Sequence, residues 1–384
     1  MFLHLTPFQR ELQQRVRALV AEKIAPRAAE LDAREEFPQE VFEAFRDAGL
    51  LRLSLPETYG GINAEATTLC LVIEEISKAS AGTALLVFPT QAVIRILRGA
   101  GSAEQQDRFF REFAAGDKLA GFCLTEPNFG SDAGSLQTRA VAEGDHYIVN
   151  GTKSYITLGP HAHYYLVFVR TGPGKRTGGI SALVVPRDTP GLTFGRQERK
   201  MGLGDSVTTE MVFTNARVPK ENRLLGEGEG WRILARQANP MRVWGAASLA
   251  LGIAEGAYEA ALDFARRRTQ FKKKIASFQA VRFMLADMKT SIEAAKSLIY
   301  RTAALIDSGE GSFRDLETLV SMSKYYTSDM AMKVAIDAVQ IFGGAGYLKG
   351  APVERLMRDA KAVQIFDGSN QIQRMVVSKN IILD

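Results

Sequence analysis

The segment RDAKAVQIFDGSNQIQR, from Arg358 to Arg374, is the most informative part of this sequence. Apolar residues recur at helical spacing from Asn370 onward, so a helix is predicted to follow Asp367. The carboxylate of Asp367 would then lie at the mouth of a helix, where Gly368 lets the backbone approach a ligand and Ser369 can cap. From these residues alone, Asp367 is either a functional carboxylate or simply the N-cap of the helix.

Two changes of hydrophobic periodicity divide the rest of the chain into three parts. Apolar residues recur at helical spacing from Thr6 to about Asp117. Short β-rich runs separated by Gly and Pro clusters then extend from about Leu119 to Phe213. After a linker at Gly226–Gly230, long helical runs resume.

These changes predict an α+β fold with three domains. We expect an N-terminal all-α domain over residues 1–118, a middle β-sandwich or flattened β-barrel over residues 119–228, and a C-terminal four-helix bundle over residues 229–384. The clearest predicted strands are His146–Val149, Tyr164–Val169, Ile180–Val185 and Thr209–Phe213. The long C-terminal helices are expected at Trp231–Arg268, Phe278–Asp307 and Phe313–Phe342.

Composition favours an ordinary globular enzyme over a nucleic-acid or membrane protein. The chain has 384 residues, of which 46% are hydrophobic and 24% are charged. The net charge of +5 is small for this length and scattered, so no nucleic-acid footprint is visible. No apolar stretch reaches membrane-spanning length, and the N-terminal segment has no signal-peptide core. We therefore expect a cytoplasmic protein without membrane insertion.

The cysteines and histidines form no metal or disulfide pattern. Cys70 and Cys123 are the only cysteines, and both lie in apolar runs, which fits a reducing compartment. His161 and His163 have strand spacing and could share one face, but no third ligand accompanies them. We expect no metal site.

Four further segments carry a resemblance to a known family. They are FCLTEPNFGSDAGS (Phe122–Ser135), NGTKSYIT (Asn150–Thr157), RRRTQFKKKIASFQAVRFMLADM (Arg266–Met288) and AVQIFGGAGYLKGAPVERLMRDAK (Ala338–Lys361). Together with Arg358–Arg374 they stand in the order found in flavin-dependent acyl-CoA dehydrogenases, and the chain resembles that family over essentially its whole length. The resemblance implies FAD as cofactor, an acyl-CoA substrate, a homotetramer and an electron-transferring flavoprotein as electron acceptor.

The resemblance also implies which residues contact FAD. Tyr155 stands where the family usually has Trp against the flavin ring, and Thr157, two residues along the same strand, can hydrogen-bond the ring. Arg268 and Gln270 match residues that reach across a subunit interface to a neighbour's adenine dinucleotide, with Phe271 beside them. Without the family pattern, Tyr155 and Thr157 would be an ordinary half-buried strand pair. The remaining expected contacts are Leu124, Thr125, Ser131, Phe278, Gln279, Gln340, Gly343, Gly344, Ser369 and Gln371.

The implied substrate site departs from the family pattern at several positions. Arg242 matches the arginine near the thioester arm, and Ser131 is placed near the same arm. Asn239 replaces the usual Asp that contacts the pantetheine, although an amide oxygen can accept the same hydrogen bond. Gly204 replaces an Arg in KMGLGDS, which is expected to alter the mouth of the site, and Lys272 replaces a Gly. The other expected substrate contacts are Phe88, Thr90, Gln91 and Gly368.

The family mechanism requires a base that removes a proton next to the thioester carbonyl, while a hydride leaves the next carbon for flavin N5. The base is usually Glu in the C-terminal motif, or in some members a Glu just before the substrate-helix Arg. These two positions hold Asp367 and Met241 in this chain. Asp367 is therefore the only matching carboxylate, and its side chain is one methylene short.

Three explanations of the shorter side chain stay open. The first is a pocket for a short, branched or alicyclic acyl group, such as cyclohexanecarboxyl, whose α-carbon lies nearer to the base. Phe88 would shorten such a pocket at its far end, unless it belongs to the helical core. The second is an Asp-based flavin oxidase that acts on a small carbon acid, as nitroalkane oxidases do, and the third is a flavin-binding pseudoenzyme. Ser131 and Arg242 favour the first explanation.

Overall fold

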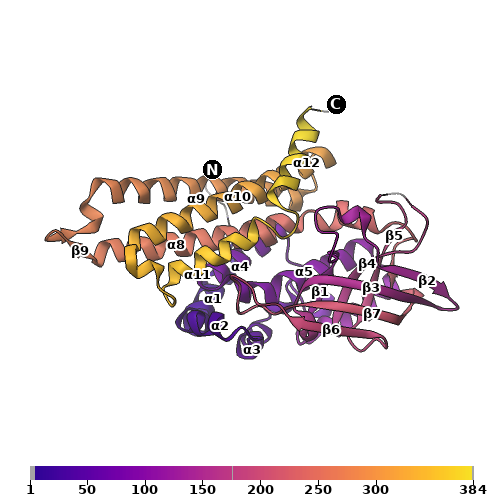
Figure 1. Ribbon diagram of the computed structural model, residues 1–384. Helices are drawn as coiled ribbons and strands as arrows, with labels where there is room; N and C mark the ends of the chain where they lie inside the picture. Colours follow the sequence, from indigo (N-terminus) through magenta and orange to yellow (C-terminus); the bar gives the residue numbers. More distant parts are fainter. Residues whose placement is uncertain (1–4, 175, 383–384) are drawn as a thin grey trace.

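The computed structural model describes residues 5–174 and 176–382, which form an N-terminal helical domain, a middle sheet domain and a C-terminal helical domain (Figure 1). This is the predicted α+β class. The first four residues of the chain, which begin the predicted N-terminal segment, lie outside the described residues. Within the described ranges we find no helix that combines the length and the apolar character needed to span a bilayer.

The N-terminal domain is built around two consecutive buried helices, α4 and α5. Its helices are α1 (Pro7–Leu19), α2 (Ala28–Arg34), α3 (Gln39–Asp47), α4 (Ala66–Ala79), α5 (Ala81–Ala100) and α6 (Ala103–Ala114). Capping boxes at Thr6 and Ser102 satisfy the first free amides of α1 and α6.

The middle domain is one sheet in which two groups of antiparallel strands are joined between β2 and β4. Its strands are β1 (Ala120–Cys123), β2 (Arg139–Glu143), β3 (His146–Thr157), β4 (Tyr164–Arg170), β5 (Ile180–Pro186), β6 (Leu192–Gln197), β7 (Thr208–Pro219) and β8 (Arg223–Leu224). They follow the order β6-β7-β3-β2-β4-β5-β8, and β1 pairs with β4. Only the pair Arg139 and Arg170 joins β2 to β4, so two antiparallel groups of strands meet there. The four predicted strands lie within β3, β4, β5 and β7.

The C-terminal domain carries the longest helices and a small hairpin. Its elements are α7 (Gly230–Ile233), α8 (Ser248–Arg267), the hairpin strands β9 (Thr269–Gln270) and β10 (Lys273–Lys274), α9 (Gln279–Ser308), α10 (Phe313–Phe342), α11 (Pro352–Val363) and α12 (Asn370–Ile382). Helix α10 contacts α8, α9, α11 and α12, and α8 also packs on α4 of the N-terminal domain. The hairpin lies at one end of this helical domain and α12 at the other, beside the sheet (Figure 1).

The structure corrects the prediction of one continuous helix over Trp231–Arg268. The chain instead forms π-helical turns at Leu234–Ala238 and Arg242–Ala247 before α8 begins. Between these turns Pro240 has no amide to donate, so the helical hydrogen bonds are interrupted there, although Asn239 before it keeps helical dihedrals. The interruption matters because it sets the position of Arg242.

Gly204 marks a close contact between the middle and N-terminal domains. Its amide donates a hydrogen bond of 3.2 Å to Asp32 Oδ1. A Cβ atom at this position would lie 2.2 Å from the backbone oxygen of Asp32, so no side chain fits without a shift of the backbone. We therefore attribute the absence of a side chain at this position to packing against α2, and the altered mouth of the site stays a prediction.

Candidate active site

The turn between α11 and α12 holds Asp367 in an unusual backbone conformation. Asp367 has a φ of +54° and Gly368 a φ of +85°, so both residues lie in the left-handed region. This conformation costs a non-glycine residue about 1–2 kcal/mol, and such strain clusters at functional sites. Helix α12 begins only at Asn370, so Asp367 lies outside the position directly before the helix. The N-cap interpretation of Asp367 is therefore wrong.

Donors from three different elements fix the carbonyl groups of this turn. Arg242 Nε donates to the Asp367 carbonyl oxygen at 2.6 Å. Lys324 Nζ, from the middle of α10, donates to the Gly368 carbonyl oxygen at 2.9 Å. Gln373 Nε2 donates to the same two oxygens at 3.4 and 3.1 Å. These bonds hold the backbone and leave the Asp367 carboxylate without a role in maintaining the turn.

The Asp367 side chain is half-buried, and its carboxylate is poorly partnered. Its Oδ2 atom is shielded from solvent and has no hydrogen-bond partner among the described residues. Burial raises the pKa of Asp367 above its ordinary value, and the positive charges of Arg242 and Lys324 oppose this rise. A carboxylate with an unused oxygen and a raised pKa is suited to accept a proton from a bound molecule.

Burial also acts on the two cations beside Asp367. It lowers the pKa of Lys324 to about 7, with the nearby Arg242 acting in the same direction and Asp367 against it. It likewise lowers the pKa of Arg242, which Asp367 partly restores. Arg242 also donates a short hydrogen bond to Asn239 Oδ1, so the departure from Asp to Asn leaves a neutral acceptor beside the guanidinium.

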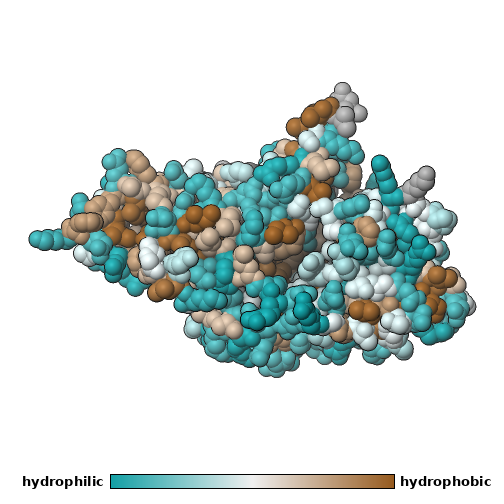
Figure 2. Space-filling model, in the orientation of Figure 1, coloured by the Kyte–Doolittle hydropathy of each residue, from teal (hydrophilic) through white to brown (hydrophobic). Residues whose placement is uncertain are grey.

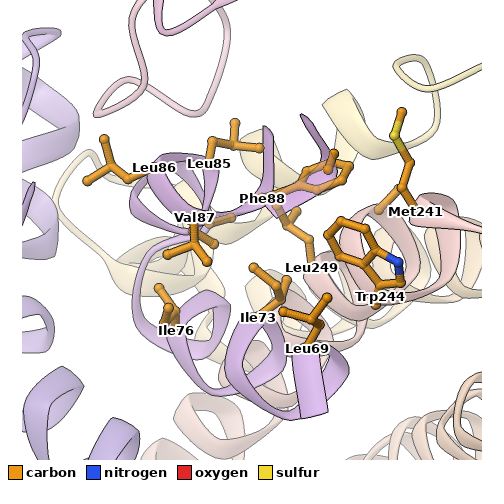
Figure 3. Packing of buried hydrophobic residues seen from close by; sticks show 14 of the residues in the cluster. Leu69, Ile73, Ile76, Leu85, Leu86, Val87, Phe88, Met241, Trp244 and Leu249 are labelled. Carbon is orange, nitrogen blue, oxygen red and sulfur yellow. The ribbon is translucent and has the colours of Figure 1, made fainter. Parts of the chain in front are cut away.

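Apolar residues of the same interrupted helix pack against α5 of the N-terminal domain (Figure 3). Trp244 packs edge-on against Phe88 of α5 with ring centroids 5.5 Å apart, and Met241 lies on the same side of the helix as Trp244. The Phe88 ring lies directly against Gly245, where any Cβ would meet it at 2.1 Å. Phe88 is only 5% exposed, so it belongs to the core, as the alternative interpretation expected.

The expected substrate contacts of Thr90 and Gln91 are not supported by their positions. Both side chains are fully buried. Thr90 Oγ1 accepts a hydrogen bond of 3.1 Å from the Ala120 amide at the start of β1. Gln91 accepts from the Ser54 amide at 2.8 Å and donates to the Leu51 carbonyl at 2.9 Å. Their polar groups are used to join segments of this chain.

In the middle domain, the loop after β1 and strand β3 lie together. The Ser154 amide donates to the Thr125 carbonyl oxygen at 2.9 Å, which brings the segment with Leu124 and Thr125 beside Tyr155. Tyr155 has a φ of +58° and is 66% exposed, and the register of β3 with β7 shifts between Lys153 and Ile156. The regular alternation of side chains between the two faces of β3 is therefore interrupted here, and Tyr155 lies in a β-bulge with its ring exposed.

The remaining expected FAD residues gather at the opposite end of the helical domain. The hairpin places Phe271 at its tip, 87% exposed, and Phe278 lies edge-on to it at 6.1 Å. Phe264 of α8 stacks on Phe342 at the end of α10, which brings the glycine segment after α10 to the same end. Figure 2 shows apolar patches over this end of the helices. The residues concerned are Arg268, Gln270, Phe271, Phe278, Gln279, Gln340, Gly343 and Gly344.

These two groups of residues fit the two parts of a flavin dinucleotide. The exposed ring of Tyr155 offers an apolar face to a planar ring system. At the other end Arg268 and Gln270 offer a cation and an amide for a diphosphate, and Gly343 and Gly344 have open space around their Cα atoms. Ser131 is exposed on the loop after β1, and Ser369 and Gln371 lie with Asp367 at the start of α12.

Several residues at this site were not found by sequence reasoning. Lys324 and Gln373 hold the Asp367 turn, and the buried ion pair of Lys153 with Glu126, at 2.8 Å, holds the loop after β1. The sequence offers little signal for Lys324: three and four positions away on α10 it has buried neighbours, but of these Val320 alone is apolar, while Ser321, Thr327 and Ser328 are polar. A lysine on the buried face of a helix requires an explanation.

The two histidines do not form a metal site. His161 ends a 3₁₀ turn, where it stacks on Phe37 at 4.2 Å, so it does not share a strand with His163. His163 Nδ1 accepts a hydrogen bond from the Leu119 amide at 3.3 Å. In the described part of the chain, no group of three or more His, Cys, Asp or Glu residues is placed to hold a metal ion.

Comparison with known protein families finds matches along nearly the whole chain. The three family models that match are acyl-CoA dehydrogenase N-terminal domain over residues 6–117, middle domain over residues 121–216 and C-terminal domain over residues 228–382. An acyl-CoA dehydrogenase of Bacillus subtilis (strain 168) is 44% identical over 382 residues, which cover 99% of both chains.

Two further similarities are to a relative named for its substrate and to a chain in a solved structure. A cyclohex-1-ene-1-carbonyl-CoA dehydrogenase of Geobacter metallireducens is 43% identical and covers 99% of both chains. A chain in a solved structure of the electron transferring flavoprotein of Acidaminococcus fermentans superposes with a TM-score of 0.96, at 39% identity and with all of both chains covered. The chain therefore belongs to the acyl-CoA dehydrogenase family of FAD-dependent oxidoreductases.

Proposed function

We propose that this enzyme dehydrogenates an acyl-CoA thioester between its α and β carbons, with Asp367 as the base that accepts the α-proton. The observation that carries this role is the buried, unpartnered Oδ2 atom of Asp367 on a turn whose carbonyl groups are bonded from three sides. FAD, when bound, supplies the acceptor for the hydride that leaves the β carbon. The α-proton passes to Asp367, and a carbon–carbon double bond forms.

The turn also offers a donor that would make the α-proton acidic. The amide of Asp367 donates no hydrogen bond within the described part of the chain, and neither does the amide of Gly368. A free amide beside the base can donate to the thioester carbonyl oxygen, where negative charge develops as the proton leaves. Successive backbone amides in a turn can form a concave site for an anionic oxygen. The same turn would thus hold both the base and the oxygen-stabilising donor.

We propose a short, branched or alicyclic acyl group for this pocket. The side chain of Asp is one methylene shorter than Glu, so the α-carbon must lie closer to the turn. Met241 leaves no second carboxylate at the alternative base position. A relative that is 43% identical to this chain is named as a cyclohex-1-ene-1-carbonyl-CoA dehydrogenase, and this name supports an alicyclic acyl group.

The test is to mix the purified yellow protein anaerobically with single compounds and follow the loss of flavin absorbance. We expect cyclohexanecarbonyl-CoA and short branched acyl-CoAs to bleach the flavin faster than palmitoyl-CoA, because a shallow pocket cannot hold a long straight chain. Bleaching by nitroethane but by none of the acyl-CoAs would instead identify a nitroalkane oxidase. No bleaching by any of these compounds would indicate a flavin-binding pseudoenzyme.

We further propose a homotetramer in which the hairpin of one subunit completes the FAD site of another. The expected FAD residues divide between the Asp367 end and the hairpin end of the helical domain, so one chain alone does not bring them together (Figure 1). The exposed Phe271 supports this arrangement, because a ring that is 87% exposed gains free energy when a partner covers it. We propose an electron-transferring flavoprotein as the electron acceptor, which the similarity to a chain in such a structure supports.

Replacing Arg268 and Gln270 together by Ala is expected to weaken FAD binding by about 10- to 100-fold, because hydrogen bonds to a charged diphosphate contribute about 1.5–3 kcal/mol. FAD retained after gel filtration of the dilute protein, with mass measured by light scattering, checks this result. Arg267→Ala is the matched control, since Arg267 pairs with Asp263 of its own helix and should retain FAD. A wild-type monomer that keeps FAD at low concentration would contradict the shared site.

A further inference from the structure

Lys324 is a buried cation without a carboxylate partner. It lies in the middle of α10 with 0% of its surface exposed, among the buried residues Val320, Ser321, Thr327 and Ser328. No carboxylate oxygen of the described residues lies within 4.0 Å of its ammonium group. Among residues 5–174 and 176–382 the other fully buried lysine is Lys153, which is paired with Glu126 at 2.8 Å. Burying an ammonium group without such a pair is costly, so its position needs a cause.

The contacts of Lys324 tie α10 to the turn that carries Asp367. Its Nζ atom donates to the Gly368 carbonyl oxygen at 2.9 Å and to Asn370 Oδ1 at 3.0 Å. Asn370 is the first residue of α12, and its Nδ2 atom donates to Asp329 Oδ1 at 2.7 Å. One buried side chain therefore fixes both the residue after Asp367 and the start of the next helix.

The charges around Lys324 leave Asp367 as its main electrostatic partner. The charged groups that act on it are Asp367 in the turn, Arg242 in the interrupted helix and Asp329 on α10. Asp329 is already engaged, because Arg374 of α12 pairs with its Oδ2 atom at 2.5 Å and Gln364 and Asn370 donate to its Oδ1 atom. Arg242 repels the ammonium group. The Asp367 carboxylate, with its unpartnered oxygen, is the remaining attractive charge.

We infer that Lys324 is a positioning residue for Asp367: it fixes the turn through the Gly368 carbonyl, and its ammonium charge keeps the Asp367 carboxylate ionised. The base role of Asp367 in this inference rests on the proposed function. Removing the ammonium charge removes one of the two effects that oppose the raised pKa of Asp367. The pKa of Asp367 should then rise further, and the carboxylate should take up its proton at a higher pH.

Lys324→Met and Lys324→Gln separate the charge from the hydrogen bond, because Gln keeps a donor while both variants lose the charge. With an acyl-CoA that reduces the wild-type flavin, we expect the acid limb of the rate–pH profile to move up by about one pH unit in both variants. The maximal rate should fall about 10-fold or more in Lys324→Met, because the turn loses a bond, and less in Lys324→Gln. Thr327→Val is the matched control: Thr327 is equally buried one turn along α10, and its hydroxyl has no partner. Its profile should not move.

A second measurement needs no substrate. The melting temperatures of the FAD-bound wild type, Lys324→Met, Asp367→Asn and the double variant are compared at pH 6 and pH 8.5. Lys324, with a pKa of about 7, is charged at the lower pH and neutral at the higher one. We expect the two changes to be non-additive at pH 6 and close to additive at pH 8.5.

Additive melting temperatures at both pH values overturn the inference, and so does an unmoved acid limb in well-folded Lys324→Met and Lys324→Gln. These outcomes are distinct from failure of the proposed function. If no acyl-CoA bleaches the wild-type flavin but the melting temperatures are non-additive at pH 6, the coupling of Lys324 to Asp367 is supported. The proposal that this site dehydrogenates an acyl-CoA is then wrong.

Discussion

Asp367→Asn is expected to leave the flavin oxidised in the presence of an acyl-CoA that reduces the wild-type enzyme. Loss of a general base typically slows the step it assists by about 10²- to 10⁴-fold. The variant should still fold and bind FAD and acyl-CoA, because the turn is held through its backbone carbonyls by Arg242, Lys324 and Gln373, and not through the carboxylate. Stopped-flow measurement of flavin reduction, with ligand binding followed by the shift of the flavin spectrum, checks both halves of this expectation.

Asp359→Asn is the matched control for this experiment. Asp359 is fully buried on α11, and burial raises its pKa to about 7. Its Oδ1 atom accepts a hydrogen bond of 2.6 Å from the Leu203 amide, which an Asn side chain can keep. Flavin reduction should proceed at the wild-type rate in Asp359→Asn, because a buried acid outside the turn has no access to the substrate. If Asp367→Asn reduced its flavin as fast as the wild type, Asp367 would not be the base.

The order of helices and strands could be predicted from the sequence because it depends on local periodicity. The runs at Phe278–Asp307 and Phe313–Phe342 became α9 and α10 with shifts of at most one residue at either end. The prediction failed at Trp231–Arg268, where the apolar spacing continues through Pro240 although the α-helical hydrogen bonds do not. Periodicity reports which face is buried and does not report whether the hydrogen bonds along the helix are unbroken.

The candidate site could be predicted only in part, because its geometry depends on contacts between distant segments. Asp367 and Arg242 were identified from the family pattern, but their contact spans 125 positions and no local signal reveals it. The left-handed backbone at Asp367 was likewise hidden: the same residues read as an N-cap, and only the start of α12 at Asn370 excludes that interpretation. Lys324 was overlooked because a single lysine in a helical pattern is normally on the solvent-facing side.

Asp367→Glu is expected to change which acyl group the enzyme prefers. The added methylene moves the carboxylate by roughly one bond length, and a misplacement of that size can cost about 100-fold in rate. We expect an alicyclic or branched acyl-CoA to lose rate by about 10- to 100-fold in Asp367→Glu. A short straight-chain acyl-CoA, whose α-carbon can lie deeper, should gain relative to it. Ratios of kcat/KM for cyclohexanecarbonyl-CoA and butyryl-CoA measure this change.

The structure allows a rearranged pocket to be told apart from a damaged turn. Glu accommodates left-handed backbone less readily than Asp, so some loss of stability is expected at a residue with a φ of +54°. That loss would lower the rates of all acyl-CoAs together, whereas a change in reach alters the ratio of kcat/KM between the two substrates. Melting temperature and the FAD content of the variant separate these effects. Equal losses for cyclohexanecarbonyl-CoA and butyryl-CoA in a stable, FAD-bound Asp367→Glu would show that the length of the base does not select the acyl group, and the alicyclic proposal would lose its physical reason.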